Sequence, residues 1–446
     1  MHSIAIILRR FQQNWTEELS PLAISQACRD AGMKWYESAL NPVVTIQLFF
    51  VQILHGNTAC EHLTQLTGRS FTAAAYCKAR MRVPLAALHL LLARCVAELQ
   101  QDGFGAARWL GHRVFHLDGS SFSMPDTREL LAHFGQHGEQ RPGCGFPTAH
   151  WLVLLHAGTG MITQMLAGPW RTHDLSGAVR LHPELRAGDV LVADRGFCSY
   201  AHLALLLQRG VQACLRIHQR TIVDFTPGRA HVTPGGGKAT RQKGLPRSRW
   251  LQALGANDQI VEWLKPPERP QWITDKQYAA LPASLVVREL RYSVTRSGFR
   301  SRQITLVTTL VDAERYSCAE LAALYQQRWQ IETNLAHLKI TLKLDVLKCK
   351  TVEGVLRELT VFALIYNLVR QVMLTAARRQ EVDVHRISFI DALRWLRSAA
   401  PGDQLPKLVV NPIRPHRLEP RVRKRRPKRF PLMGKPRYQL KKELMQ

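Results

Sequence analysis

The sequence predicts a multi-domain α/β protein, in which an α/β core follows a helical N-terminal region and is interrupted by a β-rich insertion. The chain has 446 residues, about three times the usual length of one domain. From about residue 110, short apolar segments that end near glycine alternate with helical patterns. A segment rich in Gly and Pro, followed by a long hairpin pattern, then separates the last of these strands from the next helix.

Residues 1–105 are predicted to form a helical domain. Its last helix, PLAALHLLLARCVAELQ, starts at Pro84, and proline suits the first turn of a helix. Before it, ACEHLTQL, a Thr67-Gly68 turn and a second helix opening at Ser70 resemble a helix-turn-helix in outline. Two helices packed inside an α-domain would give the same pattern. Recognition of a DNA groove is therefore one of two interpretations for the basic residues of the second helix, which are Lys78, Arg80 and Arg82.

Residues 106–217 predict the first part of the core. VFHLDG is followed by HWLVLLHA and ITQMLAG, which a Gly-Thr-Gly turn joins into a hairpin. A helix after Asp174, the strand in DVLVADRGF, the helix YAHLALLLQR and the strand VQACLRI complete the order strand, hairpin, helix, strand, helix, strand. The early antiparallel hairpin argues against a plain doubly wound sheet.

Residues 218–312 predict the β-rich insertion, in which SLVVRELRYSV and RQITLVTTLV form a long hairpin. Residues 313–400 then predict helices from Cys318 to Leu344, over about 353–379 and over 386–398. The apolar stretch VFALIYNLV is interrupted by Arg370, and no apolar run reaches the roughly 18 residues that span a bilayer. We therefore expect a buried helix rather than a membrane span.

Charge points to nucleic acid as the partner. Lys and Arg number 61 against 34 Asp and Glu, a net charge of +27. The tail, residues 401–446, includes RVRKRRPKR and is predicted to be extended or disordered. A solvated tail without a partner is the alternative, but so dense a positive charge binds phosphates through counterion release.

The cysteine pattern excludes a zinc cluster and a disulfide framework. The nine cysteines are an odd number, they are scattered, and none forms a Cys-x-x-Cys pair. The N-terminus has only five consecutive apolar residues before two arginines, which does not resemble a signal peptide. A reduced, cytoplasmic protein is expected.

Two aspartates stand where metal-dependent phosphoryl transfer would need them. Asp118 closes the apolar run VFHLD, and Asp194 closes VLVAD. Such chemistry uses several carboxylates that converge on two cations roughly 3.5 to 4 Å apart, and hard oxygen ligands favour Mg²⁺ or Mn²⁺. Taken singly, either aspartate is more often an ordinary turn or cap residue.

A helical segment supplies the third acid. Tyr325, Arg328, Glu332 and Lys339 are spaced by 3, 4 and 7 residues. At about 100 degrees per residue they fall at roughly 0, 300, 340 and 320 degrees, on one narrow face. The apolar stripe that would dock on the sheet contains Leu324, Ile331, Leu335, Leu338 and Leu342. A surface helix with an ordinary Arg328–Glu332 pair is the alternative.

The pattern Tyr-x2-Arg-x3-Glu-x6-Lys resembles the YREK signature of DDE transposases of bacterial insertion-sequence family four. LDGSSF, VADRGF, the β-rich insertion and the basic EPRVRKRRPKRFPLM segment extend the resemblance to roughly residues 60–435. It implies a ribonuclease H-like core, with a metal-binding catalytic triad of Asp118, Asp194 and Glu332. By the same resemblance Tyr325, Arg328 and Lys339 would grip DNA phosphates.

The resemblance further implies cut-and-paste transposition with two Mg²⁺ or Mn²⁺ ions. A homodimer on double-stranded DNA, bound to terminal inverted repeats and target, is expected in the bacterial cytoplasm at the nucleoid. Some family members stack a flipped base on a tryptophan shortly before the YREK helix. No tryptophan occurs between Trp272 and Trp329, so Tyr292 or Phe299 are alternative platforms, and Trp263 and Trp272 are not assigned the role.

Alternatives stay open at this stage. A ribonuclease H-like nuclease that cuts without joining would share the triad, and a transposase-derived DNA-binding protein would have lost catalysis. Three other acids also compete for the triad but rank lower. Asp174 is expected in an N-cap region and Asp189 in a turn, and Asp345 lies beyond the YREK face.

Overall fold

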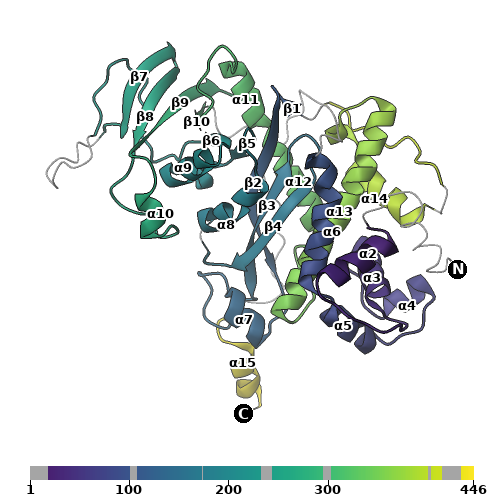
Figure 1. The fold of residues 1–446 in the computed structure, drawn as a ribbon. Helices are drawn as coiled ribbons and strands as arrows, with labels where there is room; N and C mark the ends of the chain where they lie inside the picture. Colours follow the sequence, from purple (N-terminus) through teal and green to yellow (C-terminus); the bar gives the residue numbers. More distant parts are fainter. Residues whose placement is uncertain are drawn as a thin grey trace.

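A computed structural model describes residues 19–100, 108–172, 174–232, 244–294, 303–399, 403–413 and 433–445. Within these residues ten strands form one sheet in the order β4-β3-β2-β5-β6-β10-β9-β8-β7, with β1 paired to β2 outside this path. Helices flank the sheet, and the N-terminal helices lie beside α13, with α6 also in contact with β4 (Figure 1). The predicted α/β class is confirmed.

The first half of the sheet has the predicted order. β2 is antiparallel to β3, and β3 to β4, whereas β5 runs parallel to β2 and β6 parallel to β5. These strands are β1 Arg108–Trp109, β2 His112–Ser123, β3 Thr148–His156, β4 Ile162–Pro169, β5 Val190–Ala193 and β6 Gln212–Arg216. The associated helices are α7 Arg128–Phe134, which was not predicted, α8 Asp174–Leu181 and α9 Tyr200–Gln208, with 3-10 turns at His182–Glu184 and Arg195–Phe197.

The insertion continues the same sheet. β10 pairs with β6 in antiparallel fashion, so that Thr308 stands opposite Cys214. The predicted long hairpin is β9 with β10, while the hairpin of β7 with β8 was not foreseen. The elements are β7 Ser248–Gly255, β8 Asp258–Leu264, α10 Asp275–Ala279, β9 Ser284–Ser293 and β10 Gln303–Thr308.

The N-terminal helices are α2 Pro21–Asp30, α3 Pro42–Leu54, α4 His62–Thr67, α5 Ala73–Arg82 and α6 Leu85–Gln100. Helix α4 ends at Gly68 in the left-handed region, as the sequence suggests. The second helix of the pair begins later than predicted, because the hydroxyl of Thr72, not Ser70, accepts from the Ala75 amide as its N-cap.

The C-terminal half contains α11 Cys318–Gln327, α12 Trp329–Ala336, a π-helical turn His337–Thr341, α13 Val352–Gln380, a 3-10 turn Val384–Arg386, α14 Phe389–Ser398 and α15 Arg437–Leu444. The single helix predicted from Cys318 to Leu344 is therefore interrupted at Arg328 and ends at Thr341. The prediction of an extended tail is wrong for α15, whereas residues 414–432 lie outside the described residues.

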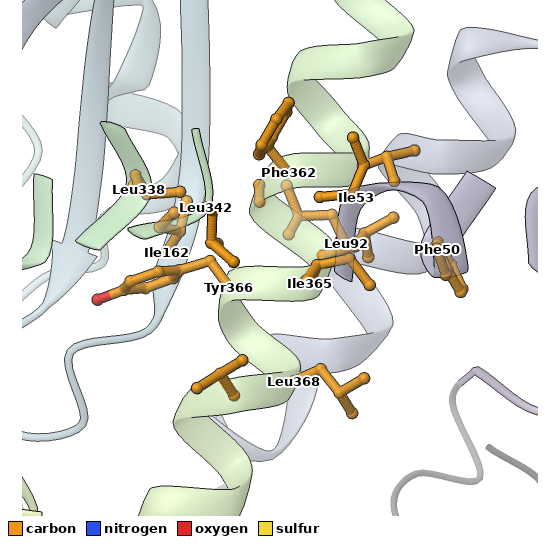
Figure 2. Close-up of a cluster of buried hydrophobic side chains, with 14 of the residues drawn as sticks. Phe50, Ile53, Leu92, Ile162, Leu338, Leu342, Phe362, Ile365, Tyr366 and Leu368 are labelled. Carbon is orange, nitrogen blue, oxygen red and sulfur yellow. The ribbon is translucent and has the colours of Figure 1, made fainter. Parts of the chain in front are cut away.

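Helix α13 joins the N-terminal helices to the sheet in one hydrophobic core. Figure 2 shows Phe362, Ile365 and Leu368 on this helix, between side chains of the sheet and π-helical turn and side chains of α3 and α6. Helix α13 is long and apolar enough to cross a bilayer, but 89% of its most apolar window is buried inside the protein. It is accordingly a core helix, and its interior placement agrees with the prediction.

Candidate active site

Strand pairing brings the two aspartates together. Leu117 of β2 stands beside Ala193 of β5 in a parallel register, so Asp118 and Asp194 are the next pair on neighbouring strands. Neighbouring strands lie roughly 4.8 Å apart. β5 ends at Ala193, and Asp194 therefore leaves the sheet at its rim while β2 continues to Ser123.

The YREK helices are placed by local signals and by burial. Helix α11 begins after Ser317, whose hydroxyl caps the Glu320 amide while the Glu320 carboxylate accepts from the Ser317 amide. The predicted apolar stripe is confirmed, since all its members are buried: Leu324, Ile331, Leu335, Leu338 and Leu342. With the stripe docked, the polar face lies against β2.

Polar contacts connect this face to the aspartates. The Tyr325 hydroxyl donates to Asp194 Oδ1 at 3.4 Å. Arg328 Nη1 lies 3.6 Å from Asp118 Oδ2, and its Nη2 lies 3.4 Å from Glu332 Oε1. Lys339 Nζ donates to the Ser120 hydroxyl at 3.2 Å. The structure thus gathers all six predicted site residues at one end of β2 and β5.

Arg328 stands at the centre of this cluster. It is only 7% exposed, and its Nε has no hydrogen-bond partner among the described residues. Its guanidinium lies 5.6 Å from the centre of the Tyr325 ring. A buried cation needs nearby negative charge, and here carboxylates of the site supply it.

The carboxylates form an electrostatically crowded group. The pKa of Asp118 is raised to about 6, chiefly by burial and to a smaller extent by the negative charges of Asp194 and Glu332. The Gly119 amide, which donates to Asp118 Oδ1 at 2.8 Å, and the Arg328 charge oppose this pKa shift. The site therefore has an excess of negative charge that one arginine does not neutralise.

In this arrangement no three His, Cys, Asp or Glu side chains of the described ranges come close enough to hold a metal ion. The reason at this site is Arg328, which contacts both Asp118 and Glu332. Ligation by all three acids would require side-chain rotation and withdrawal of the guanidinium from between them.

The competing acids have other partners or positions. Asp189 is buried and accepts from Arg113 Nε and Nη2 at 2.8 and 2.7 Å. Asp174 is the first residue of α8 and lies 3.1 Å from His150 Nε2. Asp345 is exposed beyond the π-helical turn. Asp174 nevertheless lies close to the two aspartates, since its partner His150 packs against Gly119 and its own carboxylate approaches Gly196.

The structure also shows the contacts of basic and aromatic residues that the sequence singled out as candidates for DNA binding. Arg80 does not project into solvent as a groove-reading residue would, because it donates to Gln52 Oε1 at 2.8 Å and lies over the Phe49 ring. Trp263 Nε1 donates to Glu289 at 2.8 Å. Among the base-stacking candidates Tyr292 is partly buried, and Phe299 lies outside the described residues.

Ser120 is a site residue that sequence reasoning missed. It contacts Lys339 and lies two residues after Asp118 on the same strand. Alternate residues of a strand share a face, so the segment LDGSSF already contained the signal.

Comparison with known proteins agrees with this geometry. Residues 109–368 match the family model described as the transposase DDE domain, which is more than half of the chain. The transposase InsG for insertion sequence element IS4 of Escherichia coli (strain K12) is 24% identical over 387 residues, covering 82% of this chain and 80% of that protein. A piggyBac transposase synaptic complex with hairpin DNA aligns over 89% of this chain and 80% of that one, with 9% identity and a TM-score of 0.44, too distant to bear on the assignment. The chain belongs to the transposase DDE domain family and is a DDE transposase of insertion-sequence family four.

Proposed function

We propose that Asp118, Asp194 and Glu332 hold two divalent ions, Mg²⁺ or Mn²⁺, and that the chain carries out cut-and-paste transposition. Water first hydrolyses a strand at the element end, and the freed 3′ hydroxyl then attacks target DNA. The observation that carries the proposal is the pairing of two aspartates in register, with Glu332 facing them from a helix. The donors are all hard oxygens, which suit Mg²⁺ or Mn²⁺, and three carboxylates share the site with the Arg328 guanidinium.

Bound ions would activate the attacking oxygen and stabilise the leaving one. The chain's own residues would position the DNA. Arg328 would exchange its contact with Asp118 for a phosphate oxygen, because a guanidinium suits paired hydrogen bonds to phosphate. Lys339 would add a point charge near Ser120, and the Tyr325 hydroxyl would hold Asp194 in orientation.

We further propose a ribonuclease H-like core, supported by three antiparallel strands followed by two parallel ones. The proposed helical DNA-binding domain is residues 1–105 and the basic tail is residues 401–446. Between them, the two core segments, residues 106–217 and 313–400, are separated by the insertion at residues 218–312. Synchronous chemistry at two ends would require a homodimer on DNA, acting in the cytoplasm at the nucleoid.

Strand joining to target DNA distinguishes a transposase from a nuclease that only cuts. A mini-element with its own ends is incubated with the protein in Mg²⁺, and a second substrate carries precut 3′ hydroxyl ends. Cleavage of the first and joining of the second to target DNA are expected, whereas a nuclease would cut without joining. Chelation by EDTA should abolish both reactions, and excess Mn²⁺ should restore them. Activity that persists in EDTA would contradict the metal assignment.

The basic tail offers a separate prediction. Residues 414–446 carry 13 Lys and Arg against 2 Glu. Their removal should weaken DNA binding and reduce the dependence of log K on log salt by about 0.9 per lost phosphate contact. The melting temperature should change little, because α15, in the described part of this segment, has no buried residue. A salt titration of DNA binding with both proteins checks this, and an unchanged slope would show that the tail makes no phosphate contacts.

A further inference from the structure

A pocket of about 370 Å³ opens between the N-terminal helices and the start of α13. Its wall combines Phe49 of α3, Cys77, Arg80 and Met81 of α5, and residues 348–351. The volume lies within the range of small-ligand sites and is many times that of one water molecule. None of the active-site residues lines it, so it is a separate site.

The charge of this wall has one sign. The pocket is lined by four basic residues, Arg80, Lys348, Lys350 and Arg357, and by no carboxylate. Arg357 is paired with Glu353 at 2.5 Å, but the other three form no ion pair with any residue in the described parts of the chain. A wall that is lined by basic side chains and by no carboxylate favours an anionic ligand.

The partners of these cations are neutral. Arg80 donates to Gln52 Oε1 at 2.8 Å and to Cys349 Sγ at 3.4 Å, and the Lys348 ammonium donates to the Asn57 carbonyl. Behind the wall, the Glu358 carboxylate is occupied by the Lys348 and Cys349 amides at 2.8 to 3.0 Å. The pocket also adjoins the N-terminus of a 29-residue helix, the end at which backbone dipoles favour negative charge.

A continuous strand links the pocket to the active site. Ser123, at the end of β2, forms a parallel bridge with Val346 and accepts from the Leu347 amide at 3.0 Å. Lys348 follows directly. Five residues of extended strand separate Asp118 from Ser123, which is roughly 17 Å at 3.4 Å per residue.

We propose that this basic pocket binds the backbone of the DNA whose strand is cut at the active site. One phosphate would sit between Lys348 and Lys350, while the attached sugar rests on the apolar side chain of Met81 on α5. The inference rests on the proposed function, because it presumes DNA at Asp118. It assigns a DNA contact to the segment that follows the YREK helices and to α5.

Three thiols in the wall, Cys60, Cys77 and Cys349, permit a footprint that is independent of catalysis. The full chain in EDTA is alkylated with N-ethylmaleimide, alone, with a duplex that carries the element end, or with an unrelated duplex of equal length. Mass spectrometry gives the rate of alkylation at each thiol, and Cys318 of α11, which lies outside the pocket, is the internal reference. Bound DNA should slow alkylation of the pocket thiols at least fivefold and leave Cys318 unchanged.

If both duplexes protect the pocket thiols, the pocket binds the DNA backbone regardless of sequence. If only the duplex with the element end protects them, the pocket binds the backbone of that DNA. DNA binding without protection by either duplex overturns the proposal. Because the footprint needs no metal, a footprint without cleavage counts against the triad, while cleavage without a footprint counts against the pocket.

A charge variant provides a second measurement. Lys350 is exposed, and among the described residues only its backbone carbonyl is hydrogen-bonded, as acceptor from the Thr127 hydroxyl, so Lys350→Gln should leave the melting temperature unchanged. It should weaken DNA binding roughly fivefold at 0.15 M salt and lower the salt slope by about 0.9. Lys276→Gln, an exposed lysine of α10 outside the pocket, is the matched control and should change neither quantity. Equal effects of the two variants would refute the assignment.

Discussion

Glu332→Gln should abolish cleavage and strand transfer while the protein still binds the element ends. The amide keeps the size of the side chain and an oxygen that can accept from Arg328, whose Nη2 lies 3.4 Å from Glu332 Oε1. It removes the negative charge that a divalent ion requires. We expect a loss on the order of 10³-fold or more in the rate of each step, as for other residues that act as one catalytic unit.

The binding half of this prediction separates chemistry from structure. Arg328 and Lys339 remain in the variant, so its affinity for DNA and its melting temperature should stay close to those of the wild type. Asp30→Asn is a matched control, because Asp30 also pairs with an arginine, Arg94, at 3.0 Å. Asp30 lies on α2, far from the site residues in the sequence. The control should cleave normally. A Glu332→Gln protein that cleaves at the wild-type rate would remove Glu332 from the proposed triad.

Much of the site could be read from the chain because its signals are local. Asp118 and Asp194 each end an apolar run, and apolar runs of this kind form neighbouring buried strands. The helical period then placed Tyr325, Arg328 and Glu332 on one face, where the structure has them. Strand ends and helix periods depend on residues a few positions apart, and the sequence records these directly.

Other features depend on contacts between distant segments. The sequence shows that the insertion is β-rich. It does not show that β10 pairs with β6 and so extends the core sheet. Arg80 had the same local pattern as a DNA-reading arginine, yet it is packed between Phe49, Gln52 and Cys349. The position of Arg328 between two acids likewise follows from how α12 docks on β2, which no local pattern specifies.

Buried histidines should make the protein unfold in mild acid. Burial lowers the pKa of His182 to about 3 and that of His156, His202, His337 and His385 to about 4, from the ordinary 6.5. Nearby positive charge, such as Arg370 beside His337 and His385, works in the same direction. Between pH 6.5 and 4 the unfolded chain therefore binds more protons than the folded one, and the free energy of unfolding falls as the pH falls.

At pH 5 each of these five groups contributes a loss of about 2 kcal/mol. Together they match the 5 to 15 kcal/mol by which domains are ordinarily stable. Asp118 acts in the opposite direction, because its raised pKa means that acid relieves charge repulsion, but it is one group against five. Tryptophan fluorescence and circular dichroism, followed from pH 8 to pH 4, should show cooperative unfolding near pH 5.

His337→Phe tests the cause. The His337 ring stacks on Phe389 with centroids 4.3 Å apart and planes at 9°, so phenylalanine can take its place without a charge to acquire. This variant should unfold at a lower pH than the wild type, by several tenths of a pH unit, since one proton fewer drives the transition. His133→Gln removes an exposed histidine and should leave the midpoint where it is. If the two variants shift the midpoint equally, or if the wild type remains folded at pH 4, the buried histidines do not control acid stability.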